Sequence, residues 1–387
     1  MQFKPLTDFL DSLSEKGIVG SSFAMTVGGK TICEHYSGFA DKEAKRPMAP
    51  DTLFRLFSMT KVFTNVALMQ LYEKGRLILS DPLSDYLPEF SEMQVVKVKP
   101  NGMVEFVPAK NRIRVEDIMG MTAGLVYAGA EDTASRILSR KLEDLAAEKP
   151  NYTTRDYVKV VASCPLAYEP GTHWRYSTAH EVVGALVEVL SGERFSEYVD
   201  RHICRPLGLV DTFFHAGEDR LSGRLAAYYR INRDGSSQAF TDRDDPYRPD
   251  CLMDRGGAGM ISTLGEYLRF ADTLANGGTS RDGVRIIGSR TLDLMRTNRL
   301  SPEMIPDLDW PFYRGYGYGL GVRVHMDKAS CGGGNPGEYG WDGAAGTIVF
   351  IDPEKDLAAV FMEQAAPNFK AYILPRLRNM IYTCAGL

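Results

Sequence analysis

Hydrophobic and polar positions at the start of the chain follow two different periods. Apolar residues recur at helical spacing within the first ten residues. Residues 21–27 and 31–37 are then β-prone runs joined by Gly28-Gly29. Two glycines between such runs favour a two-residue hairpin turn. The pattern predicts a helix followed by two antiparallel strands.

The next segment, residues 59–72, carries apolar side chains at helical spacing on nearly every face. A helix that is apolar all round is expected in a protein core. Gly75 follows as a C-terminal cap, because glycine adopts the left-handed backbone conformation at little cost. We therefore expect a buried helix that begins at Ser58.

From about residue 80 to residue 255, helical segments are separated by proline and glycine. Hairpin-like stretches interrupt them at 93–108 and around 232–236. Residues 178–181 match the Thr-x-x-Glu capping box and predict a helix that ends at Gly192. This middle part should be mostly helical.

Strands return in the last part of the chain. Beyond Gly256 the pattern predicts two helices, three strands and a final helix, at 264–276, 289–297, 316–325, 346–351, 357–363 and 368–382. Strands at both chain ends around a helical middle predict an α/β fold of the α+β type, with one antiparallel sheet built from both ends and flanked by helices. We expect residues 1–79 and 256–387 to form the sheet lobe, residues 80–255 an inserted, mostly helical lobe, and the cleft between them the active site.

Composition excludes several classes of function. The chain is 44% hydrophobic and 25% charged, as is typical of a soluble globular protein, and no apolar run approaches the roughly 18 residues of a membrane span. The first residues lack the regions of a signal peptide, so we expect a cytoplasmic protein. A net charge of −5 with scattered basic residues gives no stripe for phosphates, so we do not expect nucleic acid as a partner.

The spacing of cysteines and histidines argues against a metal centre. The six cysteines lie far apart without a Cys-x-x-Cys pair, and the six histidines are equally dispersed. Neither zinc sites nor disulfide frameworks have this spacing. We therefore expect reduced thiols, no metal and no cofactor.

Ser58 and Lys61 are the first candidates for chemistry. A serine hydroxyl becomes a nucleophile only beside a base. At a helix start, Ser58 would lie where backbone N–H groups favour negative charge, and Lys61 at i+3 would share its face. Apolar neighbours would lower the pKa of Lys61 and let it act as a base. A capping serine beside a snorkelling lysine is the alternative, because about one Ser-x-x-Lys is expected by chance in such a chain.

Two other motifs give no alternative site. No Gly-x-Ser-x-Gly pentapeptide occurs, so the α/β-hydrolase interpretation lacks its nucleophile. Residues 332–337 match Gly-x-Gly-x-x-Gly, but strand-like residues follow them instead of a helix. We interpret this stretch as a hairpin loop.

Three motifs resemble those of the serine β-lactamase and penicillin-binding-protein superfamily, in its class C branch and closest to the family VIII carboxylesterases. Ser58-Met59-Thr60-Lys61 is similar to the first motif, Tyr176-Ser177-Thr178 to the second and Trp341-Asp342-Gly343 to the third. Further landmarks follow in family order at 119–125, 206–209 and 256–260. The resemblance covers almost the whole chain and implies a serine hydrolase that works through an acyl-enzyme.

Two departures from the family bear on the substrate. Thr178 stands where β-lactamases usually have asparagine, and Trp341 replaces the lysine that helps hold a substrate carboxylate in relatives. Tryptophan followed two residues later by Gly343 is similar to the Trp-x-Gly of family VIII esterases. The resemblance therefore favours a neutral, small-molecule ester over a β-lactam.

The resemblance also implies roles for single residues. Ser58 would be the nucleophile, with Lys61 and Tyr176 as general base and acid, and which of the two is the base stays open. Backbone N–H groups of Ser58 and Ala344 would form the oxyanion hole.

Four residues are candidates for substrate binding. Gly343 would let its strand approach the substrate closely, and Trp341, Tyr127 and Tyr318 would line the pocket, with core packing as the alternative for each aromatic residue. An acyltransferase with the same Ser, Lys and Tyr, a β-lactamase or D-amino-acid peptidase, and a non-enzymatic binding protein remain as alternative functions. The oligomeric state is not indicated.

Overall fold

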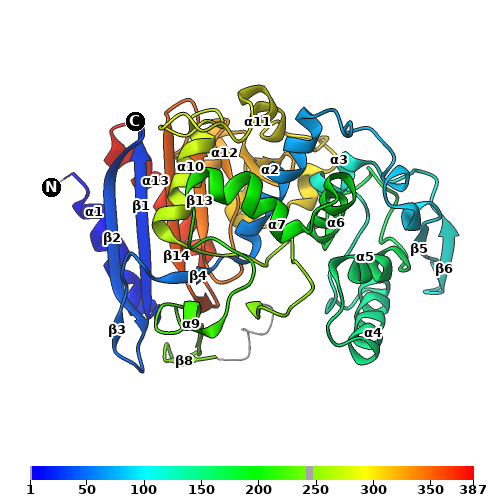
Figure 1. Ribbon diagram of the computed structural model, residues 1–387, viewed down its shortest axis with the longest axis horizontal. Helices are drawn as coiled ribbons and strands as arrows, with labels where there is room; N and C mark the ends of the chain where they lie inside the picture. The colour runs from blue at the N-terminus through cyan, green and yellow to red at the C-terminus, as the bar shows by residue number, and fades with distance from the viewer. Residues whose placement is uncertain (1, 241–246) are drawn as a thin grey trace.

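The computed structural model describes residues 2–240 and 247–387, and within them the centre of the fold is an eight-stranded sheet in the order β10-β11-β12-β13-β14-β1-β2-β3 (Figure 1). Neighbouring strands in this sheet pair antiparallel. The two chain ends meet where β1 pairs with β14, with Ser21 opposite Glu363. The prediction of one antiparallel sheet built from both ends, flanked by helices, is confirmed.

The strands and helices have the following bounds. The strands are β1 (Gly20–Val27), β2 (Lys30–Asp41), β3 (Arg46–Pro47), β4 (Leu53–Arg55), β5 (Gln94–Val98), β6 (Val104–Pro108), β7 (Tyr229–Ile231), β8 (Ser237–Ala239), β9 (Ile261–Thr263), β10 (Tyr316–Tyr318), β11 (Arg323–His325), β12 (Tyr339–Gly340), β13 (Ile348–Asp352), β14 (Leu357–Glu363) and β15 (Ala365–Ala366). The helices are α1 (Lys4–Ser12), α2 (Thr60–Glu73), α3 (Val115–Gly120), α4 (Thr133–Glu148), α5 (Thr154–Ala162), α6 (Ala179–Ser191), α7 (Phe195–Val199), α8 (Arg205–Leu207), α9 (Glu218–Leu221), α10 (Leu264–Ala275), α11 (Ser289–Met295), α12 (Lys328–Cys331) and α13 (Lys370–Ala385).

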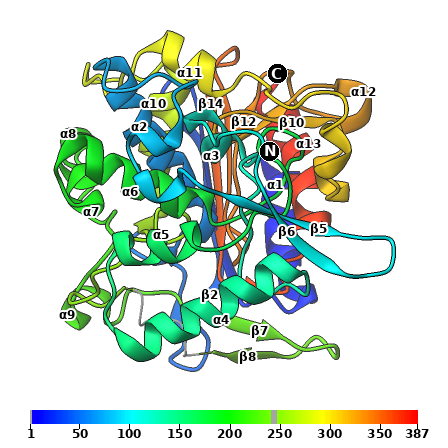
Figure 2. The same cartoon turned by 90° about the vertical axis from the view of Figure 1, so that its right-hand side faces the viewer.

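Helices cover both faces of the sheet. α10 packs against β1, β13 and β14 on one face, while α1 and α13 pack against each other on the other face (Figure 2). Every residue of β13 and β14 is buried, as their apolar sequences require of strands covered on both sides. The chain termini lie close together at the α1 and α13 end of the molecule (Figure 1).

The buried helix predicted for residues 59–72 is α2, and it is buried on all faces from Thr60 to Leu71. Gly75 has a φ of 66° and donates its N–H to Tyr72 O at 2.9 Å, so the predicted glycine cap is confirmed. Ser58 lies just before the first residue of α2, in the 3₁₀ turn η2 (Phe57–Met59), which continues directly into that helix. α2 packs against α6, which joins the first two sequence motifs in space.

Most short elements lie where the pattern predicts them. The stretches at 93–108 and around 232–236 are the hairpins β5–β6 and β7–β8, and 332–337 is a loop between α12 and β12. One strand prediction is wrong, because 316–325 forms the two strands β10 and β11. The chain turns between them, where Gly319 N–H donates to Val322 O at 2.8 Å.

The helix predicted after Thr178 is confirmed as α6, but the predicted cap is wrong. Thr178 is the N-cap residue and its side chain makes no capping hydrogen bond. The carboxylate of Glu181 instead accepts the N–H of Gly257 at 3.2 Å. The Glu181 carboxylate, which the local pattern assigns to the helix end, is thus bound by a residue distant in sequence.

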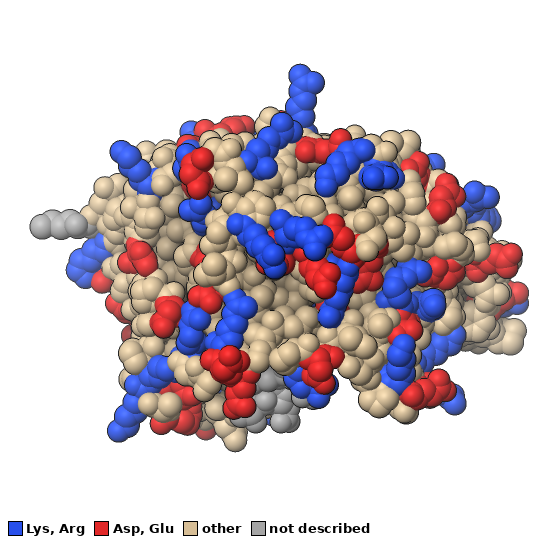
Figure 3. Space-filling model, in the orientation of Figure 1, with Lys and Arg blue, Asp and Glu red and all other residues tan. Residues whose placement is uncertain are grey.

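Cations and anions are interspersed on the face shown in Figure 3. Within residues 2–240 and 247–387, no helix is long and apolar enough to cross a membrane, and no three His, Cys, Asp or Glu side chains are grouped to hold a metal ion. All six cysteines, which lie in the described part of the chain, are free thiols. The lobe boundaries at 80 and 255, the cytoplasmic location and the partners stay predictions.

Candidate active site

The Ser58–Lys61 motif folds as its spacing predicts. Lys61 lies in the first turn of α2 and its Nζ is 3.1 Å from Ser58 Oγ. Lys61 is 0% exposed, whereas Ser58 is partly exposed. Phe57, directly before Ser58, has a φ of 47°, a left-handed conformation that is strained for an aromatic residue. The turn therefore presents a reachable hydroxyl on top of a buried amine.

The neighbours of Lys61 fix its amine. Its Nζ donates to Gly257 O at 2.7 Å and to the Tyr127 hydroxyl at 3.3 Å. Burial lowers the pKa of Lys61 from an ordinary 10.5 to about 7, while the carboxylates of Glu181 and Asp342 act in the opposite direction. A large neutral fraction of this lysine is therefore present near pH 7, as a general base requires.

Tyr176 lies on the loop before α6, as predicted, with its ring centroid 4.8 Å from Lys61 Nζ. Its hydroxyl accepts a hydrogen bond from Trp341 Nε1 at 3.2 Å. Burial raises the pKa of Tyr176, and hydrogen bonds with Ser58 and Trp341 only partly oppose this. The phenol therefore stays protonated at neutral pH, which suits a proton donor better than a base.

The third motif follows β12 and runs against the backbone before Ser58. Gly343 N–H donates to Thr347 O at 2.7 Å, and the Thr347 hydroxyl donates to Leu56 O at 3.0 Å. A Cβ at Gly343 would collide with Leu56 O, so only glycine allows this close approach. Ala344 comes next in this turn, and its carbonyl oxygen accepts from Asn368 Nδ2 at 2.7 Å. The approach brings the turn that holds Ala344 alongside the Ser58 segment.

The predicted aromatic residues take different positions. Tyr127 lies beside both Lys61 and Tyr176, with ring centroids 5.5 Å apart in the tyrosine pair. Trp341 is 1% exposed, and its ring centroid lies 5.5 Å from that of Tyr176, so its buried ring packs against the phenol. Tyr318 is fully buried and packs edge-on against Trp341 at 5.1 Å. The structure therefore places Tyr127 and Trp341 against the motif residues and Tyr318 one layer further away.

Three residues near these motifs have no predicted role in the site. Trp310 lies 5.5 Å from Tyr176 between ring centroids and is partly exposed. Lys370, in the first turn of α13, forms an ion pair with the buried carboxylate of Asp342. Glu181 lies beside Gly257 at the base of the site. Each of these contacts joins segments that are distant in sequence, so no local pattern predicts it.

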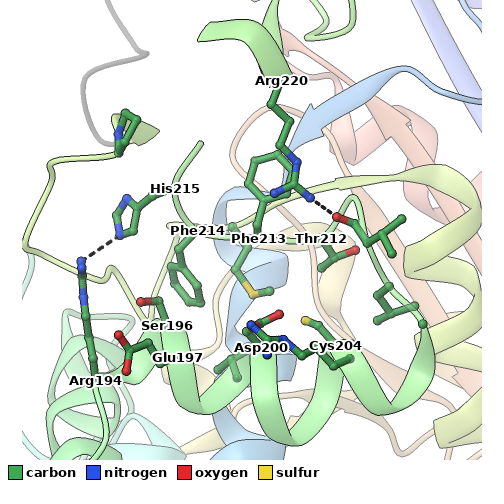
Figure 4. Close-up of a pocket in the computed structure, with 17 residues that line it drawn as sticks. Arg194, Ser196, Glu197, Asp200, Cys204, Thr212, Phe213, Phe214, His215 and Arg220 are labelled. Atoms are coloured by element: carbon green, nitrogen blue, oxygen red, sulfur yellow. Dashed lines mark hydrogen bonds and ion pairs between the residues drawn. The ribbon is translucent and has the colours of Figure 1, made fainter. Parts of the chain in front are cut away.

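A cavity of about 600 Å³ is lined by other residues (Figure 4). α7, the π-helical segment 200–204 and the 208–215 segment contribute to its lining, with Arg194 and His215 on one side and Arg220 on the other. Ser58, Lys61 and Tyr176 are not part of its lining. The location of the active site in a cleft between the lobes stays a prediction.

Comparison with known proteins identifies the family of this chain. The family model described as "Beta-lactamase" matches residues 6–379. Protein Rv1367c of Mycobacterium tuberculosis is 32% identical over 86% of this chain and 82% of its own length. Esterase EstB of Burkholderia gladioli is 28% identical over 97% of this chain and 93% of its own.

A solved structure shares the fold. It is that of EstCE1, described as a hydrolase with promiscuous acyltransferase activity, which has a TM-score of 0.81 and 24% identity and covers 98% of both chains. The chain belongs to the beta-lactamase family, as its motifs indicate. It is an enzyme of the serine hydrolase class.

Proposed function

We propose that this enzyme hydrolyses neutral carboxylic esters through an acyl-enzyme on Ser58. The observation that carries the proposal is the 3.1 Å contact between Ser58 Oγ and the buried Lys61 Nζ. The likeness to an esterase, EstB, over 97% of the chain supports the same activity.

In the first step, neutral Lys61 takes the hydroxyl proton while Ser58 Oγ bonds to the ester carbonyl carbon. The N–H groups of Ser58 and Ala344 receive the negative charge on the carbonyl oxygen. Tyr176 then gives its proton to the departing alkoxide and regains one from the Lys61 ammonium. In the second step, Lys61 takes a proton from water while the water oxygen bonds to the acyl carbonyl carbon. The bond between this carbon and Ser58 Oγ then breaks, Tyr176 gives its proton to Ser58 Oγ, and the acid is released.

Two features support a neutral substrate. Trp341 stands where relatives that bind an anionic substrate have lysine, and Lys370, the cation near the third motif, is already paired with Asp342. A substrate carboxylate would therefore meet a cation whose charge is compensated. Trp310 and Tyr127 add aromatic surface that suits an apolar acyl or alcohol group.

Acyl transfer to an alcohol is the second candidate, because it uses the same acyl-enzyme with another acceptor. The partly exposed Trp310 beside Tyr176 favours it, since an aromatic surface retains an organic acceptor that competes with water. Adding short alcohols to a p-nitrophenyl butyrate assay separates the two. New esters among the products indicate a transferase, and butyrate alone indicates a hydrolase.

The proposal is tested by a substrate panel and a covalent label. We expect turnover of p-nitrophenyl butyrate well above that of nitrocefin and D-alanyl peptides, and fluorophosphonate addition to Ser58 by mass spectrometry. Ser91→Ala, which changes an exposed serine elsewhere, is the matched control for Ser58→Ala. Preference for nitrocefin would overturn the substrate class, and an unlabelled Ser58 would overturn the mechanism.

A further inference from the structure

Glu181 and Lys61 are joined through a single residue, Gly257. Glu181 is 6% exposed, and its Oε2 accepts Gly257 N–H at 3.2 Å. Lys61 Nζ donates to the carbonyl oxygen of the same residue at 2.7 Å. α6 and α2 pack together, so both side chains are held by rigid helices.

The absence of a side chain at Gly257 lets these two groups come close. A Cβ at Gly257 would lie 2.7 Å from Glu181 Oε1 and 3.4 Å from Lys61 Nζ. Glu181 Oε1 and Lys61 Nζ can therefore be no more than about 6 Å apart, the sum of these two distances. Opposite charges this close stabilise each other strongly when both are buried.

Other ionisable groups face Lys61 from other elements. Asp342 and Lys370, from the third motif and α13, act on its pKa in opposite directions and form an ion pair with each other. The phenols of Tyr127 and Tyr176 have raised pKa values and stay neutral. Glu181 is therefore the carboxylate near Lys61 whose charge is not paired with Lys370.

Two further groups complete this environment. His180, next to Glu181 on α6, has a pKa lowered by burial and by Lys61, so its imidazole carries no charge at neutral pH. Burial raises the pKa of Glu181 above its ordinary value, while Lys61, the Gly257 N–H and Arg255 act in the opposite direction and favour the ionised carboxylate. The pair stabilises the state in which both members are charged.

We propose that Glu181 is a positioning residue for the catalytic base: its carboxylate stabilises the Lys61 ammonium that forms when Ser58 gives up its proton. The proton transfer moves positive charge onto Lys61, and the carboxylate at Gly257 is already in place to balance it. The inference rests on the proposed function, because it takes Lys61 as the base. Glu181 itself does not touch the substrate.

The pH profile of kcat/KM in Glu181→Gln tests the inference. Removing the carboxylate should lower the pKa of Lys61, so the acid limb moves down by about one pH unit or more. The plateau should fall about 10-fold, since the ammonium loses its counter-charge. Glu181→Asp keeps the charge and should restore a limb within about half a pH unit of the wild type.

Glu188→Gln is the matched control, since Glu188 is a partly buried carboxylate on the same helix that accepts Phe195 N–H at 3.1 Å. It should leave the acid limb in place. An unshifted limb in an active Glu181→Gln enzyme overturns the inference, because a purely structural role changes thermal stability and not the limb. If that variant does not fold, the same comparison is made with Glu181→Ala, which also removes the carboxylate and should move the acid limb down, and an unshifted limb in that enzyme is then decisive.

Fluorophosphonate labelling of wild-type Ser58 distinguishes failure of the proposed function from failure of the role proposed for Glu181. An unlabelled wild-type enzyme without esterase activity contradicts the proposed function. A labelled, active enzyme whose limb does not depend on Glu181 contradicts only the role of this carboxylate.

Discussion

Two of the clusters of buried charge in the described part of the chain differ in what lies at their edge. In one, Arg323 and Glu338 are both 0% exposed with N···O at 3.5 Å, and Arg378 donates to the Tyr316 hydroxyl at 2.6 Å. In the other, Lys61 is equally buried, but it contacts the partly exposed Ser58. The first cluster joins buried groups to one another, and the second connects a buried charge to a reachable hydroxyl.

Buried charge alone therefore does not identify an active site in this protein. Both clusters contain groups with shifted pKa values, since burial raises the pKa of Glu338 and lowers that of Lys61. What differs is the consequence of removing a group. Loss of a partner in the first cluster should cost stability, and loss of one in the second should cost activity.

Ser58→Ala should show the largest effect and leaves the fold intact. We expect kcat/KM for p-nitrophenyl butyrate to fall about 10⁴-fold or more, because the nucleophile is gone, with an unchanged melting temperature. Steady-state kinetics and thermal unfolding of the same preparation measure both. Retention of most activity would remove the distinction between the two clusters.

Glu338→Ala should reverse this outcome. It leaves Arg323 and Arg378 buried without their carboxylate, so the free energy of unfolding should fall by about 3–5 kcal/mol. Urea titration measures this, and fluorophosphonate labelling of Ser58 should proceed at the wild-type rate in the folded fraction. Glu105→Ala, at an exposed carboxylate in β6, is the control and should change neither quantity. A stable Glu338→Ala protein with impaired labelling would place this cluster in the catalytic machinery.

The wild-type pH profile tests whether the buried Lys61 acts as the base. Lys61 accepts a proton only when neutral, and its pKa is about 7, so kcat/KM should rise through pH 7 and fall about tenfold per unit below it. Initial rates from pH 5 to pH 9 measure this limb. A flat profile across pH 7 would show that the buried lysine is not the base.

Asp342→Asn should have the smallest effect, and this effect should be on the choice of substrate. It frees the charge of Lys370, so an ester that carries a carboxylate should gain about 3- to 10-fold in kcat/KM relative to p-nitrophenyl butyrate. Lys370→Met in the same background should abolish the gain. An equal change for both substrates would mean that this ion pair only supports the turn.

Much of the sheet could be predicted because its signals are local. β14 lies at its predicted bounds, since its apolar run follows the turn at 353–356 and is ended by the polar residues Glu363 and Gln364. The strands β10 and β11 were predicted as one, because alternation continues through Gly319 and Gly321 and hides the turn. Glycines inside an alternating run signal a strand and a bend equally well.

The site likewise contains residues that local patterns predict and residues that only tertiary packing brings in. Ser58 and Lys61 follow from i+3 spacing on one helix, and Tyr176 from the motif around it. Glu181 could not be placed, because the Thr-x-x-Glu pattern offers a complete local explanation, and only the packing of Gly257 against α6 shows another partner. Trp310 and Lys370 reach the site through tertiary packing, which no short sequence window contains.

The pairing of β1 with β14 has a consequence for how the enzyme is made. The hairpin β1–β2 leaves the ribosome early, but its neighbour in the sheet is synthesised only near the end of translation. Contacts this distant along the chain form late, and the turn with Gly343 and the ion pair of Lys370 also depend on the last segments. A polypeptide interrupted during synthesis therefore carries Ser58 and Lys61 without the partners that complete the site, and hydrolytic activity appears only in the finished chain.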